Sequence, residues 1–297
     1  MLILFSAACK QKENNKLSDF EYNFGAAQIT CDENYKSLTD ELIKSYENVF
    51  DSTDIEASYV TEQDAIDLFL KDSIQLMMIG RNLSEAELNN ASITQGLRPK
   101  QNIIAYEAIA VIASTEMPDS IFDLDAFIQN SSAGVKNKYT DTKFIFENAK
   151  SGTLAYLFNT TGLQQPSTQN MFAVDSLEAF MQYLKTDKNA IGFLSFAQLS
   201  DNDDPVVKDI LKEIKILKVV HTDTTGVRMI AELSQSTIAT KEYPLVRPIN
   251  VVVGNISERV GMGFVNFLYK QKSARIFLKA GLIPSQIPER QILINED

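Results

Sequence analysis

The sequence contains no tryptophan, a single histidine (His221) and only two cysteines (Cys9 and Cys31) among its 297 residues. Structural and catalytic zinc sites draw three or four ligands mainly from histidine and cysteine. This count nearly excludes a zinc site of the usual kind. We therefore expect neither a metal nor any other cofactor.

Basic residues are also scarce, with 28 Lys and Arg against 39 Asp and Glu, which gives a net charge of −11. A nucleic-acid backbone would be repelled by such a field, and no local cluster of Lys or Arg offsets it. The sequence also lacks a run of about 20 apolar residues, the length that a membrane-spanning helix needs. We expect no nucleic-acid partner and no spanning helix.

The composition is otherwise that of a globular protein, with 44% hydrophobic residues. A chain of this length can bury a sizeable core and forms roughly one to three domains. Strand-like and helix-like apolar periods alternate along it, which is typical of the α/β class.

The first twelve residues, MLILFSAACKQK, form an apolar run that ends in small residues before a cysteine. This pattern is typical of the end of a secretion signal, and Ser6-Ala7-Ala8-Cys9 resembles a bacterial lipobox, in which the cysteine is acylated. The polar residues after Cys9 suit a flexible tether, so we expect residues 1–22 to be a signal remnant and lipid anchor. The alternative is a ragged, disordered N-terminus with a cysteine of the buried type at position 9. A lipid on Cys9 would leave Cys31 without a disulfide partner.

Three strands are each followed by a turn and a helix. The strand GAAQIT precedes a helix over residues 34–50, with Asp32 as a candidate cap. The apolar run 74–79 ends in Gly80-Arg81, and Ser84 to Glu87 has capping-box spacing. The strand 143–146 is followed by Ser151-Gly152-Thr153 and a helix.

The remaining segments follow the same alternation. A long strand over 103–113 is apolar on both faces, as a central strand should be. The other expected helices cover residues 121–128, 176–184, 205–214, 257–269 and 273–280, and the other expected strands cover residues 190–196, 216–221, a segment from 227, and 249–253.

The order of these segments resembles the periplasmic phosphate-binding proteins that deliver ligand to ABC importers, from about residue 23 onward. The motifs that carry the resemblance are, in chain order, QIT-CDEN, IQLMMIGR-NLSEAE, AYEAIAVIA, FENAKSGTLAYLF, AIGF, YPLVRP and FVNFLYKQKSARIFLKAGLIP. The resemblance implies a two-lobed type II periplasmic binding protein, each lobe a mostly parallel sheet flanked by helices, with ligand in the cleft. It implies one lobe from residues 23–105 plus 226–297 and another from 106–225.

Ser151, Gly152 and Thr153 are the first candidate ligand-binding residues. A helix N-terminus exposes unpaired N–H groups and a partial positive charge, which favour an anion. Glycine lets the anion approach the backbone, and the two hydroxyls can add hydrogen bonds. The alternative is that Ser151 and Thr153 only cap the helix.

Arg81 is the second candidate, because it follows a buried strand and precedes a helix, where open α/β sheets place their ligands. Its guanidinium can hold an oxyanion through two parallel hydrogen bonds. The alternative is a salt bridge to Glu85 or Glu87. Arg247, in YPLVRP, is interpreted as a structural residue that bridges elements.

The first turn departs from the pattern of the family, which usually carries Ser or Thr with Gly at this position. Here the turn is Thr30-Cys31-Asp32-Glu33. We expect Thr30 to contact the ligand. Asp32 could accept a proton from a protonated oxyanion such as HPO₄²⁻ and so disfavour sulfate, or it could simply cap the helix.

Catalysis is not expected. The pair Lys150-Ser151 could activate a serine hydroxyl only with a geometry that adjacency does not supply. The function predicted is a monomeric, membrane-anchored lipoprotein of the cell envelope, on its periplasmic face. It would capture a small oxyanion, phosphate first, by lobe closure and present it to an ABC permease. The alternative is an envelope lipoprotein of the same fold that acts as a sensor or interaction protein without binding phosphate.

Overall fold

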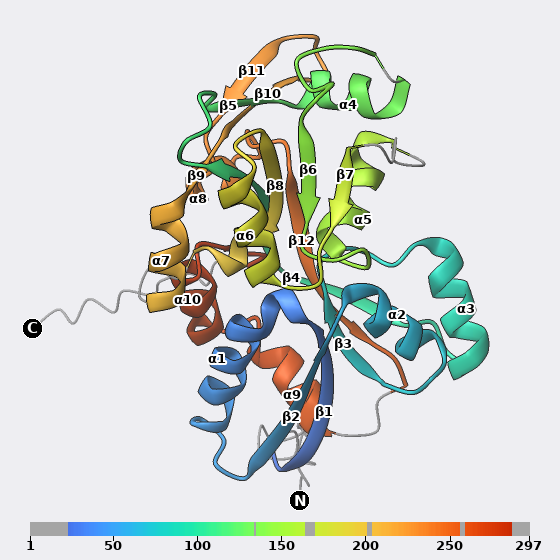
Figure 1. The fold of residues 1–297 in the computed structure, drawn as a ribbon. Coiled ribbons are helices and arrows are strands. Elements are labelled where there is room, and N and C mark those ends of the chain that lie inside the picture. The colour runs from blue at the N-terminus through green and yellow to red at the C-terminus, as the bar shows by residue number, and fades with distance from the viewer. Residues whose placement is uncertain (1–22, 134, 164–169, 201–203, 256–258, 287–297) are drawn as a thin grey trace, which may run out of the picture.

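The computed structural model describes residues 23–133, 135–163, 170–200, 204–255 and 259–286 (Figure 1). The strands are β1 (Gly25–Asp32), β2 (Thr53–Val60), β3 (Leu76–Ile79), β4 (Lys100–Ser114), β5 (Ile121–Asp123), β6 (Lys143–Phe146), β7 (Met171–Ala173), β8 (Ala190–Ser195), β9 (Ile214–Ile216), β10 (Lys218–Thr222), β11 (Arg228–Ala231), β12 (Val246–Val253) and β13 (Ile283–Pro284).

Helices fill most of the connections between these strands. The α-helices are α1 (Lys36–Glu47), α2 (Glu62–Leu70), α3 (Glu85–Gln95), α4 (Leu124–Ala133), α5 (Gly152–Thr161), α6 (Leu177–Thr186), α7 (Pro205–Glu213), α8 (Gln235–Ala239), α9 (Arg259–Phe267) and α10 (Gln271–Lys279). Two short 3-10 helices, η2 (Glu33–Tyr35) and η3 (Phe196–Gln198), follow β1 and β8.

The main sheet has the strand order β2-β1-β3-β12-β4-β8-β6-β7, and β9 and β13 also pair with β4. The outer strands are parallel at both ends, where β1 pairs with β2 and β3, and β6 pairs with β7 and β8. The central strands β12 and β4 are antiparallel to their neighbours. The predicted α/β class is thus confirmed, with the two parallel groups joined through β4 and β12.

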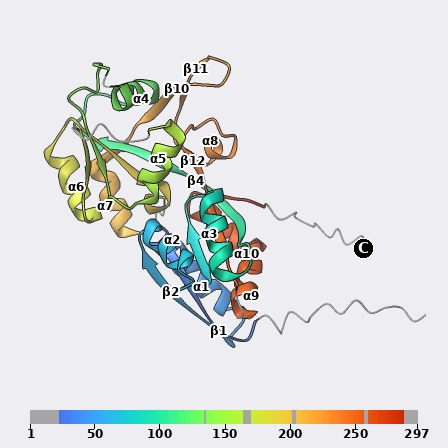
Figure 2. The ribbon, with the colours of Figure 1, turned by 90° about the vertical axis from the view of Figure 1, so that its right-hand side faces the viewer.

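The helices gather around the two ends of this sheet as two bodies (Figure 2). We call the body with β1–β3, α1–α3, α9 and α10 the lower lobe, and the body with β5–β11 and α4–α8 the upper lobe. Each has its own apolar core, one around Tyr46 and Phe264 and the other around Phe122 and Phe193. The two-lobed architecture is therefore present.

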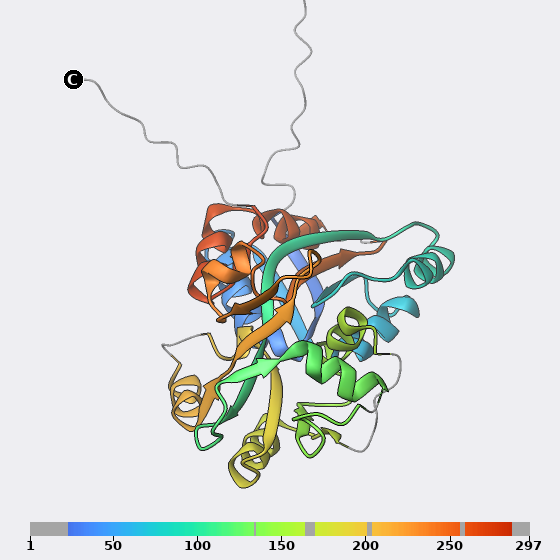
Figure 3. The ribbon, with the colours of Figure 1, turned by 90° about the horizontal axis from the view of Figure 1, so that it is seen from above.

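Strand β4 is common to both lobes. Its 15 residues pair with β12 and β13 towards the lower lobe and with β8 and β9 towards the upper lobe. At about 3.3 Å per residue it reaches roughly 50 Å, enough to run through both bodies. Figure 3 shows this teal strand crossing the molecule from one side to the other.

The two lobe boundaries, at residues 105/106 and 225/226, stay a proposal. Ala231, Ile238, Tyr243 and Leu245 belong to the apolar core of the upper lobe, although they follow residue 226. This packing favours a second crossing near the start of β12 rather than before β11.

Most of the expected elements form, but several segments differ from the prediction, among them β7, α8 and β13, which were not predicted. Residues 121–123, expected to begin a helix, are strand β5, and α4 starts at Leu124. Strand β2 and helix α2, over residues 53–70, were not predicted at all. No helix in the described ranges combines the length and apolarity needed to cross a bilayer.

Cys31 lies on β1 in the core of the lower lobe, with no exposed surface and no disulfide partner among the described residues. Burial raises the pKa of its thiol to about 12. The thiolate is therefore suppressed in the folded protein.

The central strands are linked by a buried ion pair, Arg247 Nε to Glu107 Oε1 at 2.7 Å, with both side chains fully buried. Burial alone would lower the pKa of Arg247, but the charge of Glu107 raises it. The prediction that Arg247 bridges elements is confirmed, since the pair joins β12 to β4.

Glu107→Gln should lower the free energy of unfolding by about 3–5 kcal/mol, because it leaves a buried guanidinium without its counter-charge. Chemical denaturation followed by circular dichroism measures this. Glu85→Gln is the matched control, since its pair with Arg98 is exposed and contributes little. Equal denaturation midpoints for Glu107→Gln and Glu85→Gln would show that the Arg247–Glu107 pair is not needed for stability.

Candidate functional site

The lobes meet at Glu62, the first residue of α2 in the lower lobe. Thr61 caps this helix, and its side chain accepts a hydrogen bond from the Asp64 N–H. Glu62 is only 1% exposed; its Oε2 accepts a hydrogen bond of 2.7 Å from the Gly80 N–H, and its Oε1 lies 3.3 Å from Arg81 Nε. The carboxylate is thus held by groups at the end of β3.

The upper lobe brings the N-terminus of α5 against the same carboxylate. Ser151 is the N-cap, with its Oγ accepting a hydrogen bond of 3.2 Å from the Leu154 N–H. A Cβ atom on Gly152 would lie 2.5 Å from Glu62 Oε2, too close for any real contact. Glycine therefore permits the approach that places Glu62 at the positive end of the helix.

A second carboxylate, Glu147 after β6, also joins the lobes. It accepts hydrogen bonds from Asn34 Nδ2 at 2.8 Å, Gln198 Nε2 at 2.9 Å and Thr153 Oγ1 at 3.1 Å. Asn34 comes from η2 of the lower lobe. Burial raises the pKa of Glu147, although these donors act in the opposite direction.

Asp32 lies at the end of β1 in the same contact region. Its Oδ1 accepts a hydrogen bond of 3.1 Å from the Asn34 N–H, so its predicted role as cap of the turn is confirmed. Its buried Oδ2 finds no hydrogen-bond partner in the part of the chain that the structure describes. Burial, followed by the nearby charge of Glu62, raises the pKa of Asp32 well above its ordinary value.

Beneath these groups lies the Arg247–Glu107 pair. The Glu107 carboxylate also accepts hydrogen bonds from the Tyr35 hydroxyl and, at 2.5 Å, from Ser195 Oγ. Both Nη atoms of Arg247 are buried and make no hydrogen bond to any described residue. The guanidinium lies directly under Gly80, whose added Cβ would be 3.0 Å from its Cζ.

Arg81 is engaged mainly with another carboxylate. Its Nη1 and Nη2 donate to Glu87 at 2.9 Å and 2.8 Å, and its side chain is 15% exposed. The salt bridge to Glu87 that the sequence left open is therefore present, whereas Glu85 pairs with Arg98. Arg81 also lines a groove of about 670 Å³ between the lobes, whose upper wall includes Phe158 and Asn159.

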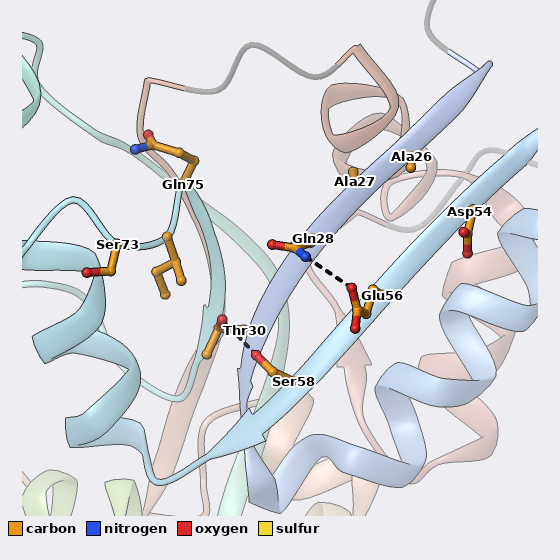
Figure 4. Close-up of a pocket in the computed structure, with 10 residues that line it drawn as sticks. Ala26, Ala27, Gln28, Thr30, Asp54, Glu56, Ser58, Ser73 and Gln75 are labelled. Carbon is orange, nitrogen blue, oxygen red and sulfur yellow. Dashed lines mark hydrogen bonds between the residues drawn. The ribbon is translucent and has the colours of Figure 1, made fainter.

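Thr30 does not join this group. Its hydroxyl makes a hydrogen bond of 2.9 Å with Ser58 on β2, and both residues line a separate groove of about 510 Å³ on the lower lobe (Figure 4). Ile29 and Cys31 point into the core, so Thr30 and Asp32 share the opposite face of β1, but Thr30 lies two residues before the end of the strand. The structure thus assembles Asp32, Arg81, Ser151, Gly152 and Thr153 without Thr30. Cys9 lies outside the described residues.

Glu62 and Glu147 were both missed by the sequence analysis. The signal for Glu62 was available, because the alternating strand DIEASYV is followed by Thr61-Glu62-Gln63-Asp64, a further strand-to-helix turn. Its approach to Gly152 depends on how the lobes meet, which local patterns do not specify. Among the described residues, no group of three or more His, Cys, Asp or Glu side chains is arranged to hold a metal ion.

Both the sequence and the fold of the chain resemble those of known proteins. The sequence of residues 21–272 matches the family model for the PBP superfamily domain. A structure from Clostridium perfringens, assigned as a phosphate ABC transporter substrate-binding protein with bound phosphate, is 19% identical with a TM-score of 0.69, over 88% of this chain and 100% of that one. No curated protein sequence matches the chain.

Other solved structures share the fold at similar distance. A phosphate transport receptor of the ABC type from Vibrio cholerae has 17% identity and a TM-score of 0.65, over 88% of this chain and 100% of that one. The CcmR regulatory domain from Synechocystis in complex with 2-PG has 14% identity and a TM-score of 0.53, over 82% and 95%. At these identities the likeness establishes the fold.

Asp32→Asn should stabilise the protein at pH 7. The raised pKa of Asp32 means that the folded state disfavours its charged form. The free energy of unfolding of the wild type therefore falls as pH rises above about 4, the ordinary pKa of the group, and the asparagine variant escapes this loss. Thermal melts between pH 4 and pH 8 should show a difference that grows with pH.

The matched control is Asp54→Asn, which removes the same charge from an exposed position on β2. Its effect on the melting temperature should be small at every pH. If Asp32→Asn lowers the melting temperature at pH 7, the carboxylate is stabilising and its assigned state is wrong.

Proposed function

Because the chain belongs to the PBP superfamily, we propose that it is a solute-binding protein that captures a small oxyanion, phosphate first, by lobe closure. In this proposal it delivers the anion to the permease of an ABC importer and performs no catalysis itself. The family match and the phosphate bound in the Clostridium perfringens structure support it.

The observation that carries the proposal is the convergence of anion-binding groups from both lobes on one carboxylate. The lower lobe contributes the Gly80 N–H and Arg81 Nε, and the upper lobe contributes the N-terminus of α5 at Gly152. A backbone N–H, a guanidinium and a helix N-terminus are the usual partners of an oxyanion. Here they hold Glu62, so the site is chemically built for an anion.

The proposed mechanism is closure around the anion. An oxyanion at this position would contact the lower lobe through Arg81 and Gly80 and the upper lobe through Ser151, Gly152 and Thr153. Such a bridge favours the closed form of the protein, which is the form that a permease would recognise. The central strands β4 and β12 would carry the hinge.

Asp32 would select for a protonated oxyanion. Its raised pKa and its Oδ2, which has no hydrogen-bond partner among the described residues, suit it to share a proton with the ligand. A deprotonated Asp32 and a fully deprotonated anion such as sulfate would repel each other, so sulfate would bind less well.

We also propose that the protein is a monomeric lipoprotein on the periplasmic face of the cell envelope, anchored through Cys9. The lipobox-like residues Ser6-Ala7-Ala8-Cys9 support this location. The location also suits a receptor for an importer.

A second candidate function is an envelope sensor or interaction protein that does not bind phosphate. It is favoured by the three buried carboxylates Asp32, Glu62 and Glu147 at the contact between the lobes. A dianionic ligand bound at this contact would be repelled by all three carboxylates. Regulatory domains also share this fold, as in the Synechocystis structure.

Isothermal titration calorimetry of the chain carrying Cys9→Ser, purified without phosphate, tests the two candidates. We expect saturable binding of phosphate, weaker binding of sulfate, and an affinity for phosphate at least tenfold lower in Arg81→Ala and Ser151→Ala. Each variant removes one group that contacts the proposed anion from one lobe. The control is Arg98→Ala, which removes an exposed arginine from the same lobe as Arg81. This variant should bind phosphate as the wild type does.

Absence of heat with either anion, from protein shown to be folded, would favour the second candidate. Wild-type affinity in both Arg81→Ala and Ser151→Ala would place the phosphate elsewhere.

Lipidation of Cys9 is tested by expressing the full chain in a bacterial host with a labelled fatty acid. The wild type should incorporate the label and fractionate with membranes. Cys9→Ser should lose both properties, whereas Cys31→Ser should keep them because Cys31 is buried in the core. Label on the Cys9→Ser protein would contradict the assignment.

A further inference from the structure

We propose that Glu62 is an internal anion of the cleft: its carboxylate occupies the oxyanion position, holds the lobes together, and must be displaced by an external ligand. This inference rests on the proposed function, because it concerns the same site. It identifies the residue that sets the threshold for ligand binding.

The contacts of Glu62 are those of a ligand rather than of a surface side chain. Its Oε2 accepts a hydrogen bond of 2.7 Å from the Gly80 N–H, and its Oε1 lies 3.3 Å from Arg81 Nε. The same carboxylate lies so close to Gly152 that a Cβ there would be 2.6 Å from its Cδ. A carboxylate has the charge and hydrogen-bond acceptors of an oxyanion, so it can substitute for one at all three points.

An external anion cannot share this position with Glu62. The two would compete for one N–H, one guanidinium nitrogen and one helix N-terminus. Asp32 is near enough for the charge of Glu62 to raise its pKa, so the region already carries mutual repulsion between carboxylates. Removing the charge of Glu62 should therefore strengthen the binding of an oxyanion.

The groove between the lobes gives Glu62 a direction in which to move, although Glu62 itself is buried and does not line it. Glu62 is the first residue of α2, and the next residue, Gln63, lines the groove of about 670 Å³ between the lobes, together with Arg81. A change of side-chain rotamer towards this groove would vacate the site without unfolding α2. The exposed pair Lys150–Asp64, at 2.7 Å, would still link α2 to the upper lobe.

The experiment compares wild type, Glu62→Gln, Glu62→Ala and the exposed control Glu85→Gln, all carrying Cys9→Ser. Small-angle X-ray scattering in phosphate-free buffer reports lobe separation, and calorimetry reports phosphate affinity. We expect Glu62→Ala to have a larger radius of gyration than the wild type and at least tenfold tighter phosphate binding. Glu62→Gln keeps the shape without the charge, so its phosphate affinity should lie between the two.

The two readouts separate the inference from the function on which it rests. An unchanged radius of gyration and no gain in phosphate affinity in Glu62→Ala and Glu62→Gln would overturn the inference, even if the wild type binds phosphate. If Glu62→Ala opens the lobes but no variant binds phosphate, the role of Glu62 as an internal anion is supported and the proposed capture of phosphate is ruled out. A variant that only loses thermal stability, without opening or tighter binding, would show Glu62 to be structural and also overturn it.

Discussion

The buried pair between Arg247 and Glu107 organises the centre of this protein. It joins the two antiparallel strands β4 and β12, which pass between the lobes. Glu107 also binds Tyr35 from the turn after β1 and Ser195 at the end of β8. One carboxylate thus sets the positions of a turn in the lower lobe and a strand end in the upper lobe.

The same pair determines the electrostatics of the contact above it. Arg247 lies under Gly80, and its charge lowers the pKa of Asp32, Tyr35 and Glu147 against the effect of burial. Without this buried cation, several carboxylates could not be placed so near one another in a region closed to water. The Arg247–Glu107 pair therefore stabilises the central strands and also allows several carboxylates to lie together where the lobes meet.

The sequence predicted three of the strand-to-helix turns and missed the one at Thr61-Glu62. Capping at Ser84 and Ser151, the cap at Asp32 and the long central strand all depend on local chemistry, and all are present. Local patterns do not specify which carboxylate meets a given arginine. Arg81 therefore had two possible partners in the sequence, and only the folded chain selects Glu87.

The position of Thr30 shows a different limit. Alternation along β1 places Thr30 on the same face as Asp32, so the strand pattern alone does not exclude Thr30 from the site. The resemblance to phosphate binders favoured the hydroxyl at this turn, and the actual neighbour, Ser58, belongs to a strand that was not predicted. Glu62 was missed for the same reason, since α2 follows that strand. A single unassigned segment of 18 residues, 53–70, thus concealed the central carboxylate of the site.

Because Cys31 is buried, its reactivity towards alkylating reagents measures how often the core of the lower lobe opens. With its thiol pKa raised to about 12 and no exposed surface, Cys31 is protected from alkylating reagents for as long as β1 stays in the sheet. In a chain that carries Cys9→Ser it is the sole thiol, so each labelled molecule records one opening of the lower core. The rate of alkylation then separates opening of that core from hinge motion, because a rotation of the lobes that leaves β1 paired would expose no sulfur.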